Sequence, residues 1–153
     1  MKNVAVFGAG RIGRIHAGNL ARLPGVSLKY VCDPFGDSAA QLAQQLGAQV
    51  ATMDDALLDP SIDAVVIGSP TSTHSDLITR AAAAGKHIFC EKPVDLSVPR
   101  AVECGEKVRA AGVACMIGFQ RRFDPTFNEV RRRIDPGEIG NPEMLVITSR
   151  DPG

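Results

Sequence analysis

The sequence lacks an excess of charge of either sign. Its 17 basic residues balance its 17 acidic residues, so no long-range field would draw the chain to nucleic acid or to a membrane surface. The one basic cluster, residues 131–133, is followed closely by Asp135 and Glu138, and we interpret it as a solvated helix face. The composition therefore predicts neither a nucleic-acid partner nor a membrane partner.

Long apolar runs and paired cysteines are also missing. No apolar stretch approaches the roughly 20 residues that a membrane span needs, and the N-terminus begins with a strand-like run, unlike a signal peptide. The four cysteines, Cys32, Cys90, Cys104 and Cys115, are far apart and form no C-x-x-C pair. Three of them lie in or beside apolar runs, where buried free thiols are usual. These features predict a protein of the reducing cytoplasm.

The chain does have an alternating pattern of strand-like and helix-like segments. The expected strands are residues 3–8, 26–33, 48–52, 63–70, 87–91 and 113–119. The expected helices between them are residues 11–23, 37–47, 53–59, 73–86 and 97–112. We expect Asp37 or Ser38 to cap the second of these helices and Ser97 to cap the fifth. This alternation predicts an α/β fold, a doubly wound parallel sheet with right-handed crossovers, over residues 1–123.

The rhythm changes after Phe119. A helix is expected over residues 124–135, and a strand over 143–150 arrives with no crossover helix after it. That strand would need a sheet to join, and the remaining length supplies none. We therefore expect residues 124–153 to begin a truncated second domain of α+β type, and the sequence to be the front part of a longer protein.

Three glycines stand in G-x-G-x-x-G spacing directly after the first expected strand. Gly8 permits the tight strand-to-helix turn, Gly10 lets a pyrophosphate approach the backbone, and Gly13 lets the helix pack on the strand. The pyrophosphate would then lie on the free amides and the positive dipole end of the helix. With Arg11 and Ile12 between them, these glycines form the predicted cofactor-binding loop.

Asp33 stands where the second strand ends, 20 residues after Gly13. Its carboxylate can accept hydrogen bonds from both hydroxyls of an adenine ribose. It would repel a 2′-phosphate, and no Arg or Lys follows within D-P-F-G-D to receive one. These residues predict NAD as the cofactor and disfavour NADP. The alternative is that Asp33 is a turn former before Pro34.

The end of the fourth strand carries the small polar stretch S-P-T-S-T-H. Ser69, Pro70 and Thr71 could lie beneath the nicotinamide ribose or the pyrophosphate, and the hydroxyls from Ser69 to Thr73 could equally cap the helix that begins near Thr73. Both interpretations stay open.

The three histidines are not equivalent. His74 could reach the cofactor or the substrate, although a lone histidine in the first turn of a helix is more often structural. We interpret His16, within a helix, and His87, at the start of a strand, as structural. No group of His, Cys, Asp and Glu has metal-ligand spacing, so no metal is expected.

A family resemblance becomes specific when these stretches are taken together. G-A-G-R-I-G-R-I-H, the run from Ser69 to Ser97 that contains C-E-K-P, and G-F-Q-R-R-F-D-P resemble, in this order, the glucose-fructose oxidoreductase/inositol dehydrogenase (Gfo/Idh/MocA) family. The closing I-G-N-P-E-M-L-V-I-T-S-R-D-P resembles its inositol 2-dehydrogenase branch. The resemblance covers essentially the whole chain, and E-K-P is its most diagnostic motif.

The resemblance implies roles for particular residues. Lys92 would contact the substrate and the nicotinamide ribose, Glu91 would orient nearby groups, and the Lys92–Pro93 peptide would be cis. Arg121 or Arg122 would lie near the substrate. The family's D-x-x-x-H pair, whose histidine takes the hydroxyl proton, would lie beyond residue 153, in a second domain whose sheet commonly makes a homo-oligomer.

The resemblance also decides how Lys92 is interpreted. The alternative is a charge in a solvated turn, but we interpret Lys92 as an active-site cation. An ammonium beside a developing alkoxide would favour charge build-up as hydride leaves carbon.

The leading expectation is an NAD-dependent oxidoreductase that takes hydride from a cyclic polyol, myo-inositol or a related cyclitol. The 153 residues alone are expected to be inactive because they lack the proton acceptor. The alternatives are a sugar dehydrogenase or reductase of the same family, and a non-catalytic NAD-binding module.

Overall fold

The fold was obtained as a computed structural model that describes residues 1–148 and 150. The chain divides into two compact units, the first ending at Gly118 and the second beginning at Phe119. We describe each unit by itself. The expected domain boundary after residue 123 lies slightly further along the chain.

The first unit is built on one six-stranded sheet. Its strands are β1 (Lys2–Phe7), β2 (Val26–Cys32), β3 (Gln49–Val50), β4 (Ala64–Ile67), β5 (His87–Cys90) and β6 (Cys115–Ile117). All neighbouring strands are parallel, and their order is β3-β2-β1-β4-β5-β6. The strand order reverses direction between β1 and β4, which is the switch point of a doubly wound sheet. The predicted α/β class is therefore confirmed.

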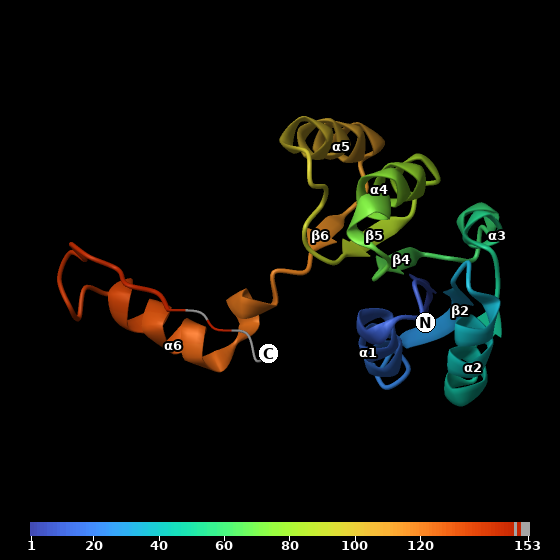
Figure 1. The fold of residues 1–153 in the computed structure, drawn as a ribbon, viewed down its shortest axis with the longest axis horizontal. Coiled ribbons are helices and arrows are strands. Elements are labelled where there is room, and N and C mark those ends of the chain that lie inside the picture. Colours follow the sequence, from blue (N-terminus) through green and yellow to red (C-terminus); the bar gives the residue numbers. More distant parts are fainter. Residues whose placement is uncertain (149, 151–153) are drawn as a thin grey trace. The chain divides into compact units, whose positions relative to one another are not determined.

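Helices cover both faces of this sheet. They are α1 (Arg11–Leu20), α2 (Gly36–Leu46), α3 (Met53–Leu58), α4 (His74–Ala83) and α5 (Val98–Ala111). Figure 1 shows α1 and α2 on one side of the strands and α3, α4 and α5 on the other, in agreement with two separate apolar cores.

Alternate residues of each strand enter the two cores. In β1, Val4 and Val6 pack with the core beneath α1 and α2, whereas Ala5 and Phe7 pack with the core beneath α3 to α5. Because both faces of a parallel strand are buried, its sequence is a nearly continuous apolar run. This is why these strands could be recognised without a polar face.

Two helix starts differ from the expectation. Helix α2 begins at Gly36 with Phe35 as its N-cap, so the predicted caps Asp37 and Ser38 lie inside its first turn, where an acid favours the helix dipole. Ser97 is the N-cap of α5, as predicted, but no amide in the described part of that turn donates to its hydroxyl. Gly47 and Gly112 end α2 and α5 in the left-handed conformation.

The second unit begins with a 3₁₀ turn, η2 (Gln120–Phe123), and continues with α6 (Pro125–Ile134). The Asp124 carboxylate caps α6 by accepting hydrogen bonds from the amides of Thr126 and Phe127.

The strand expected over residues 143–150 is wrong for residues 143–148 and Arg150, which have no regular structure; Ser149 lies outside the described residues. A strand needs a neighbour for its amides and carbonyls, and no strand is described within this unit. Residues 144–147 are correspondingly 71–84% exposed. Among the described residues, no helix is long and apolar enough to cross a bilayer.

Candidate functional site

A cavity of about 1330 Å³ lies at the carboxyl ends of β1, β2 and β4. We call it the crevice. This position, outside the strand ends at the switch point, is where doubly wound sheets bind ligands. The crevice brings together seven of the predicted site residues, which are Gly8, Gly10, Arg11, Ile12, Asp33, Ser69 and Pro70.

The glycine loop has a separate physical reason for each of its glycines. Gly8 has a φ of +103°, and a Cβ there would lie 2.8 Å from the backbone of Gly68. A Cβ on Gly13 would lie 1.8 Å from the carbonyl oxygen of Gly8, so α1 can approach the loop this closely only because Gly13 has no side chain. A Cβ on Gly10 would meet no described heavy atom within 4 Å. Gly8 and Gly13 therefore serve packing, whereas Gly10 leaves space in the crevice.

The N-terminus of α1 can bind an anion. Gly10 is its N-cap, no side chain of the described residues caps it, and no acidic residue lies in its first turn. The first amides of a helix have no intrahelical acceptor, and here they belong to a turn whose residues Gly10, Arg11 and Ile12 line the crevice. These free amides and the helix dipole match a pyrophosphate, so the residues present fit a dinucleotide.

Asp33 faces the glycine loop from the end of β2. Its Oδ2 accepts a hydrogen bond from the amide of Ala9 over 2.6 Å, and its Oδ1 accepts one from the amide of Phe35 over 2.8 Å. The bond from the Phe35 amide, two residues further along the chain, is typical of a turn-forming aspartate. The alternative interpretation of Asp33 as a turn former is therefore also observed. A carboxylate has about four acceptor positions, and the remaining ones are available to a ligand in the crevice.

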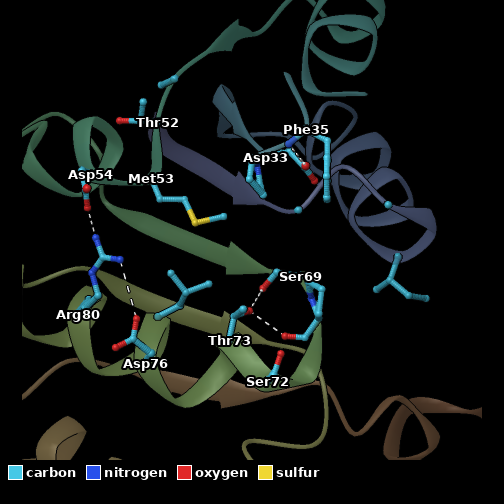
Figure 2. A pocket seen from close by; sticks show the side chains of 18 of the residues that line it. Asp33, Phe35, Thr52, Met53, Asp54, Ser69, Ser72, Thr73, Asp76 and Arg80 are labelled. Carbon is cyan, nitrogen blue, oxygen red and sulfur yellow. Dashed lines mark hydrogen bonds and ion pairs between the residues drawn. The ribbon is translucent and has the colours of Figure 1, made fainter. Parts of the chain in front are cut away.

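The far end of the crevice was not predicted from the sequence. Arg80 lies there between Asp54 and Asp76, with ion pairs to both, and the side chain of Met53 extends into the crevice (Figure 2). Leu77 completes an apolar wall, which suits a flat ring system. Arg80 and Asp54 are 26 residues apart on different helices, so no local pattern could have indicated that they meet.

The loop after β4 forms the side of the crevice opposite Asp33 (Figure 2). Its 3₁₀ turn, η1 (Thr71–Thr73), leads into α4. The hydroxyls of Ser69 and Thr73 are 2.7 Å apart, and Thr73 donates to the carbonyl of Pro70. No hydroxyl in this described segment caps α4, so the capping interpretation is not observed. Thr71 is not among the described residues that line the crevice.

The end of β5 brings together four residues of interest. The Lys92–Pro93 peptide is cis, as the resemblance implied. Lys92 is exposed, and its ammonium has no hydrogen bond or ion pair with the residues that the structure describes. Glu91 Oε1 lies 2.8 Å from Nε2 of His16. None of these four residues is in the described lining of the crevice.

The contacts of His74 and His16 can be compared with the roles predicted for them from the sequence. His74 is 2% exposed, and its ring nitrogens lie 2.7 Å from the carbonyl oxygen of Pro93 and 2.9 Å from that of Ser69. A direct cofactor contact of His74 stays a prediction. His16 was interpreted as structural, yet it contacts Glu91 of the diagnostic motif. A separation of 75 residues left no sequence signal for that pair.

Arg121 and Arg122 belong to the second unit. Both lie in η2, and the guanidinium of Arg121 stacks over the ring of Phe127 at 5.1 Å. Their predicted place near a substrate stays a prediction.

The cysteines are free thiols, as predicted. Cys32, Cys90 and Cys104 are buried, and Cys115 is half-buried. Burial raises the pKa of the Cys32 and Cys90 thiols to about 12, so both stay protonated and neither can act as a thiolate nucleophile.

Residues 2–119 match a protein-family model described as "Oxidoreductase family, NAD-binding Rossmann fold". The chain is 48% identical over 152 residues to scyllo-inositol 2-dehydrogenase (NAD(+)) of Bacillus subtilis, covering 97% of this chain and 44% of that relative. It is also 48% identical over 147 residues to inositol 2-dehydrogenase of Rhizobium meliloti, covering 96% of this chain and 44% of the relative.

Solved structures agree with these relatives. A myo-inositol dehydrogenase of Corynebacterium glutamicum superposes with a TM-score of 0.84 at 45% identity, over 92% of this chain and 43% of that one. The scyllo-inositol dehydrogenase of Lactobacillus casei, solved with NAD(H) and scyllo-inositol, superposes with a TM-score of 0.87 at 30% identity and the same coverage. The chain thus spans less than half the length of the relatives it matches. With a family match over most of its residues, the chain belongs to the Gfo/Idh/MocA family of oxidoreductases with an NAD-binding Rossmann fold, which confirms the resemblance of its motifs.

Proposed function

We propose that this chain is the cofactor-binding part of an NAD-dependent dehydrogenase that oxidises a cyclic polyol of the inositol class. The observation that carries the proposal is the crevice, in which the open face of Gly10 and the free helix amides lie on one side and the Asp33 carboxylate ends the neighbouring strand. The relatives named above are inositol dehydrogenases, and they match nearly the whole chain.

The residues of the crevice would divide the cofactor between them. The amides at Arg11 and Ile12 would hold the pyrophosphate, Asp33 would accept hydrogen bonds from the adenine ribose, and Ser69 and Pro70 would lie beside the nicotinamide ribose. Because a carboxylate repels a 2′-phosphate, NAD is preferred over NADP. NAD, when bound, supplies the nicotinamide that accepts the hydride.

The residues that follow β5 and β6 would serve the substrate. The exposed ammonium of Lys92 would stabilise negative charge on the hydroxyl oxygen as the hydride leaves, and Glu91 would orient it. Arg121 or Arg122 would contact the substrate. The proton acceptor and the remaining substrate contacts would come from a second domain that begins near residue 124, as the coverage of the relatives suggests. We also propose a homo-oligomer in the cytoplasm.

Two experiments test this proposal. Calorimetric titration of the 153-residue chain should give a dissociation constant at least ~10-fold lower for NAD than for NADP, since one charge clash can supply the ~1.4 kcal/mol required. The reading frame should then be sequenced beyond codon 153, and its product assayed for NAD reduction with myo-inositol, scyllo-inositol and glucose. A downstream D-x-x-x-H with inositol oxidation supports the proposal.

The other outcomes of the second experiment are distinct. Preferred oxidation of glucose would favour the sugar-dehydrogenase alternative. NAD binding without oxidation of any of these substrates would favour a non-catalytic module.

A further inference from the structure

Lys92 lies between Glu91 and Pro93, and each of these two residues contacts a histidine from a different helix. On its N-terminal side, the Glu91 carboxylate contacts His16 of α1. On its C-terminal side, the carbonyl oxygen of Pro93 contacts His74 of α4. The two histidines are 58 positions apart in the sequence, so only the fold brings them to the same short segment.

The contact with His16 fixes the Glu91 side chain on several sides. Oε1 lies 2.8 Å from His16 Nε2, while Oε2 accepts a hydrogen bond from the Lys92 amide over 3.3 Å. The imidazole also packs edge-on against Phe89, with ring centroids 5.0 Å apart. A Cβ on Gly118 would come within 3.2 Å of Oε1, so the residue directly after β6 also lies close to this carboxylate. Both partner side chains are only 21% exposed, and the pair is thus shielded from much of the water that weakens surface pairs.

The contact with His74 fixes the other side of Lys92. His74 is buried, and it bridges the carbonyl oxygens of Pro93 and Ser69. Ser69 lines the crevice. His74 therefore lies between two segments, the one that contains Lys92 and the loop opposite Asp33. Each ring nitrogen faces a carbonyl oxygen, and a neutral imidazole donates to one of the two, so the tautomer sets which carbonyl is bonded. Its burial leaves the ring little room to reorient.

We propose that His16 and His74 form a two-histidine clamp that fixes where the Lys92 side chain leaves the backbone. Both are positioning residues in this proposal, acting through Glu91 and Pro93. A lysine side chain has many rotamers, and a misplacement of 1 Å can cost about 10²-fold in rate. Since His16 belongs to the helix whose N-terminus borders the crevice, the clamp sets Lys92 and the cofactor phosphates against the same element. The chemical role of Lys92 itself rests on the proposed function.

The third histidine provides a matched control. His87 lies at the start of β5, and its Nδ1 accepts a hydrogen bond from the Ala114 amide over 3.2 Å. Like His16 and His74, His87 makes a hydrogen bond. It lies at the first residue of β5, whereas Lys92 follows the last residue of that strand. Loss of His87 removes a histidine and a contact without touching the clamp.

The clamp is tested without cofactor by ¹⁵N relaxation of the 153-residue chain. In His16→Ala, the order parameters of the Lys92 and Val94 amides should fall from about 0.85 to below about 0.6. His16→Gln should restore them, because its carboxamide can donate from nearly the same place as Nε2. His87→Ala should leave them unchanged. His74→Leu should loosen the same amides, and if that variant does not fold, His74→Asn, which keeps a donor near Nδ1, should remain rigid at Lys92.

A double-mutant cycle in NADH affinity connects the clamp to Lys92. His16→Ala and Lys92→Ala should each weaken NADH binding by at least about 3-fold, and the double variant should be no weaker than Lys92→Ala alone. Rigid Lys92 and Val94 amides in His16→Ala, or fully additive losses of affinity, would overturn the clamp. Mobile amides combined with a Lys92→Ala chain that binds NADH normally would support the clamp and instead count against the cofactor contact of Lys92.

Discussion

The Asp33 carboxylate accepts a hydrogen bond from the amide of Ala9 over 2.6 Å, so the acid that follows β2 holds the loop that follows β1. Ala9 lies between Gly8 and Gly10, the first two glycines of the motif. The same carboxylate accepts from the amide of Phe35. A substitution of Asp33 therefore changes the shape of the glycine loop as well as the recognition of a ribose.

Two variants of Asp33 separate these effects. Asp33→Asn removes the charge and keeps an acceptor oxygen for only one of the two amides, so the preference for NAD over NADP should shrink by about tenfold. Its melting temperature should fall less than that of Asp33→Ala, which loses both acceptors. Asp33→Ala removes both acceptors, so the partly buried amide of Ala9 and the exposed amide of Phe35 lose their hydrogen bonds. The loss at Ala9 should cost about 1–3 kcal/mol in the free energy of unfolding. Calorimetric titration and urea unfolding measure the two quantities. Equal affinity of the unsubstituted chain for NAD and NADP would contradict the role of Asp33.

Helix α1 provides a matched pair of glycine substitutions. Gly13→Ala should destabilise the chain by about 3 kcal/mol or more, because its Cβ would overlap the Gly8 carbonyl oxygen and force the helix away from the loop. Gly18 lies in the same helix, with no described atom within 4 Å of an added Cβ, so Gly18→Ala should stabilise by about 0.5–1 kcal/mol. Denaturant unfolding decides, and similar effects at both positions would show that the contact at Gly13 is not tight.

Gly10 tests binding without testing folding. Gly10 lines the crevice, and an added Cβ would meet no described heavy atom within 4 Å. Gly10→Ala should therefore leave the melting temperature within about 2 °C of the original, since surface changes are usually within ±0.5 kcal/mol. It should weaken NAD binding by at least about tenfold, because the pyrophosphate can no longer approach the backbone. Unchanged NAD affinity would mean that the phosphates lie elsewhere.

Lys92 and Lys86 form a contrasting pair of lysines. Lys92 is exposed, so Lys92→Ala should hardly change the melting temperature, while in an active enzyme that contains this chain it should lower kcat/KM by roughly 10²-fold or more. Lys86 is 6% exposed and donates to the carbonyl oxygens of Asp59 and Ile62. Lys86→Met should cost about 1–3 kcal/mol of stability and leave kcat nearly unchanged. A Lys92→Ala enzyme that keeps its rate would remove Lys92 from the chemistry.

Acid should weaken the first unit through Asp59. Its carboxylate accepts from Lys29 over 2.7 Å and from the Tyr30 hydroxyl over 2.9 Å, and the Lys29 hydrogen bond, with that of Ser61, holds the pKa of Asp59 well below its usual range. A lowered folded pKa adds stability that is fully present above the unfolded value of about 3.9 and is lost as the pH falls through the folded pKa. The melting temperature of Asp59→Asn should accordingly fall less between pH 5 and pH 2 than that of the original chain. If the melting temperatures of Asp59→Asn and the original chain fell equally with pH, the contribution of Asp59 to acid sensitivity would be contradicted.

Local patterns carried most of what could be predicted from the sequence. The glycine loop and Asp33 could be predicted as parts of a cofactor site because each directly follows a β-branched apolar run, which predicts a strand. The start of α2 was misplaced because Phe35, an N-cap without a capping side chain, has no sequence signature. The strand expected near the end of the chain failed for a different reason, since pairing is a property of a neighbour and is not contained in the segment itself.

Long-range pairs of side chains were the part of the site that could not be predicted. His16 with Glu91, and Arg80 with Asp54, meet only because crossovers return the chain to the same edge of the sheet. A helical position for His16 could be read from periodicity, but its partner could not. Such pairs need the sheet order before they can be recognised.

The strand order has a consequence for synthesis on the ribosome. Strand β1 is made well before β4, its partner on one side, in which Ile67 lies opposite Phe7. Ile67 is 60 residues after Phe7, and translation of 60 residues takes about 3–12 s at usual rates. During that interval the nascent chain exposes one unpaired edge of an apolar V-A-V-F strand. A chaperone that binds extended apolar segments would find its target there, at the segment that later becomes the centre of the sheet.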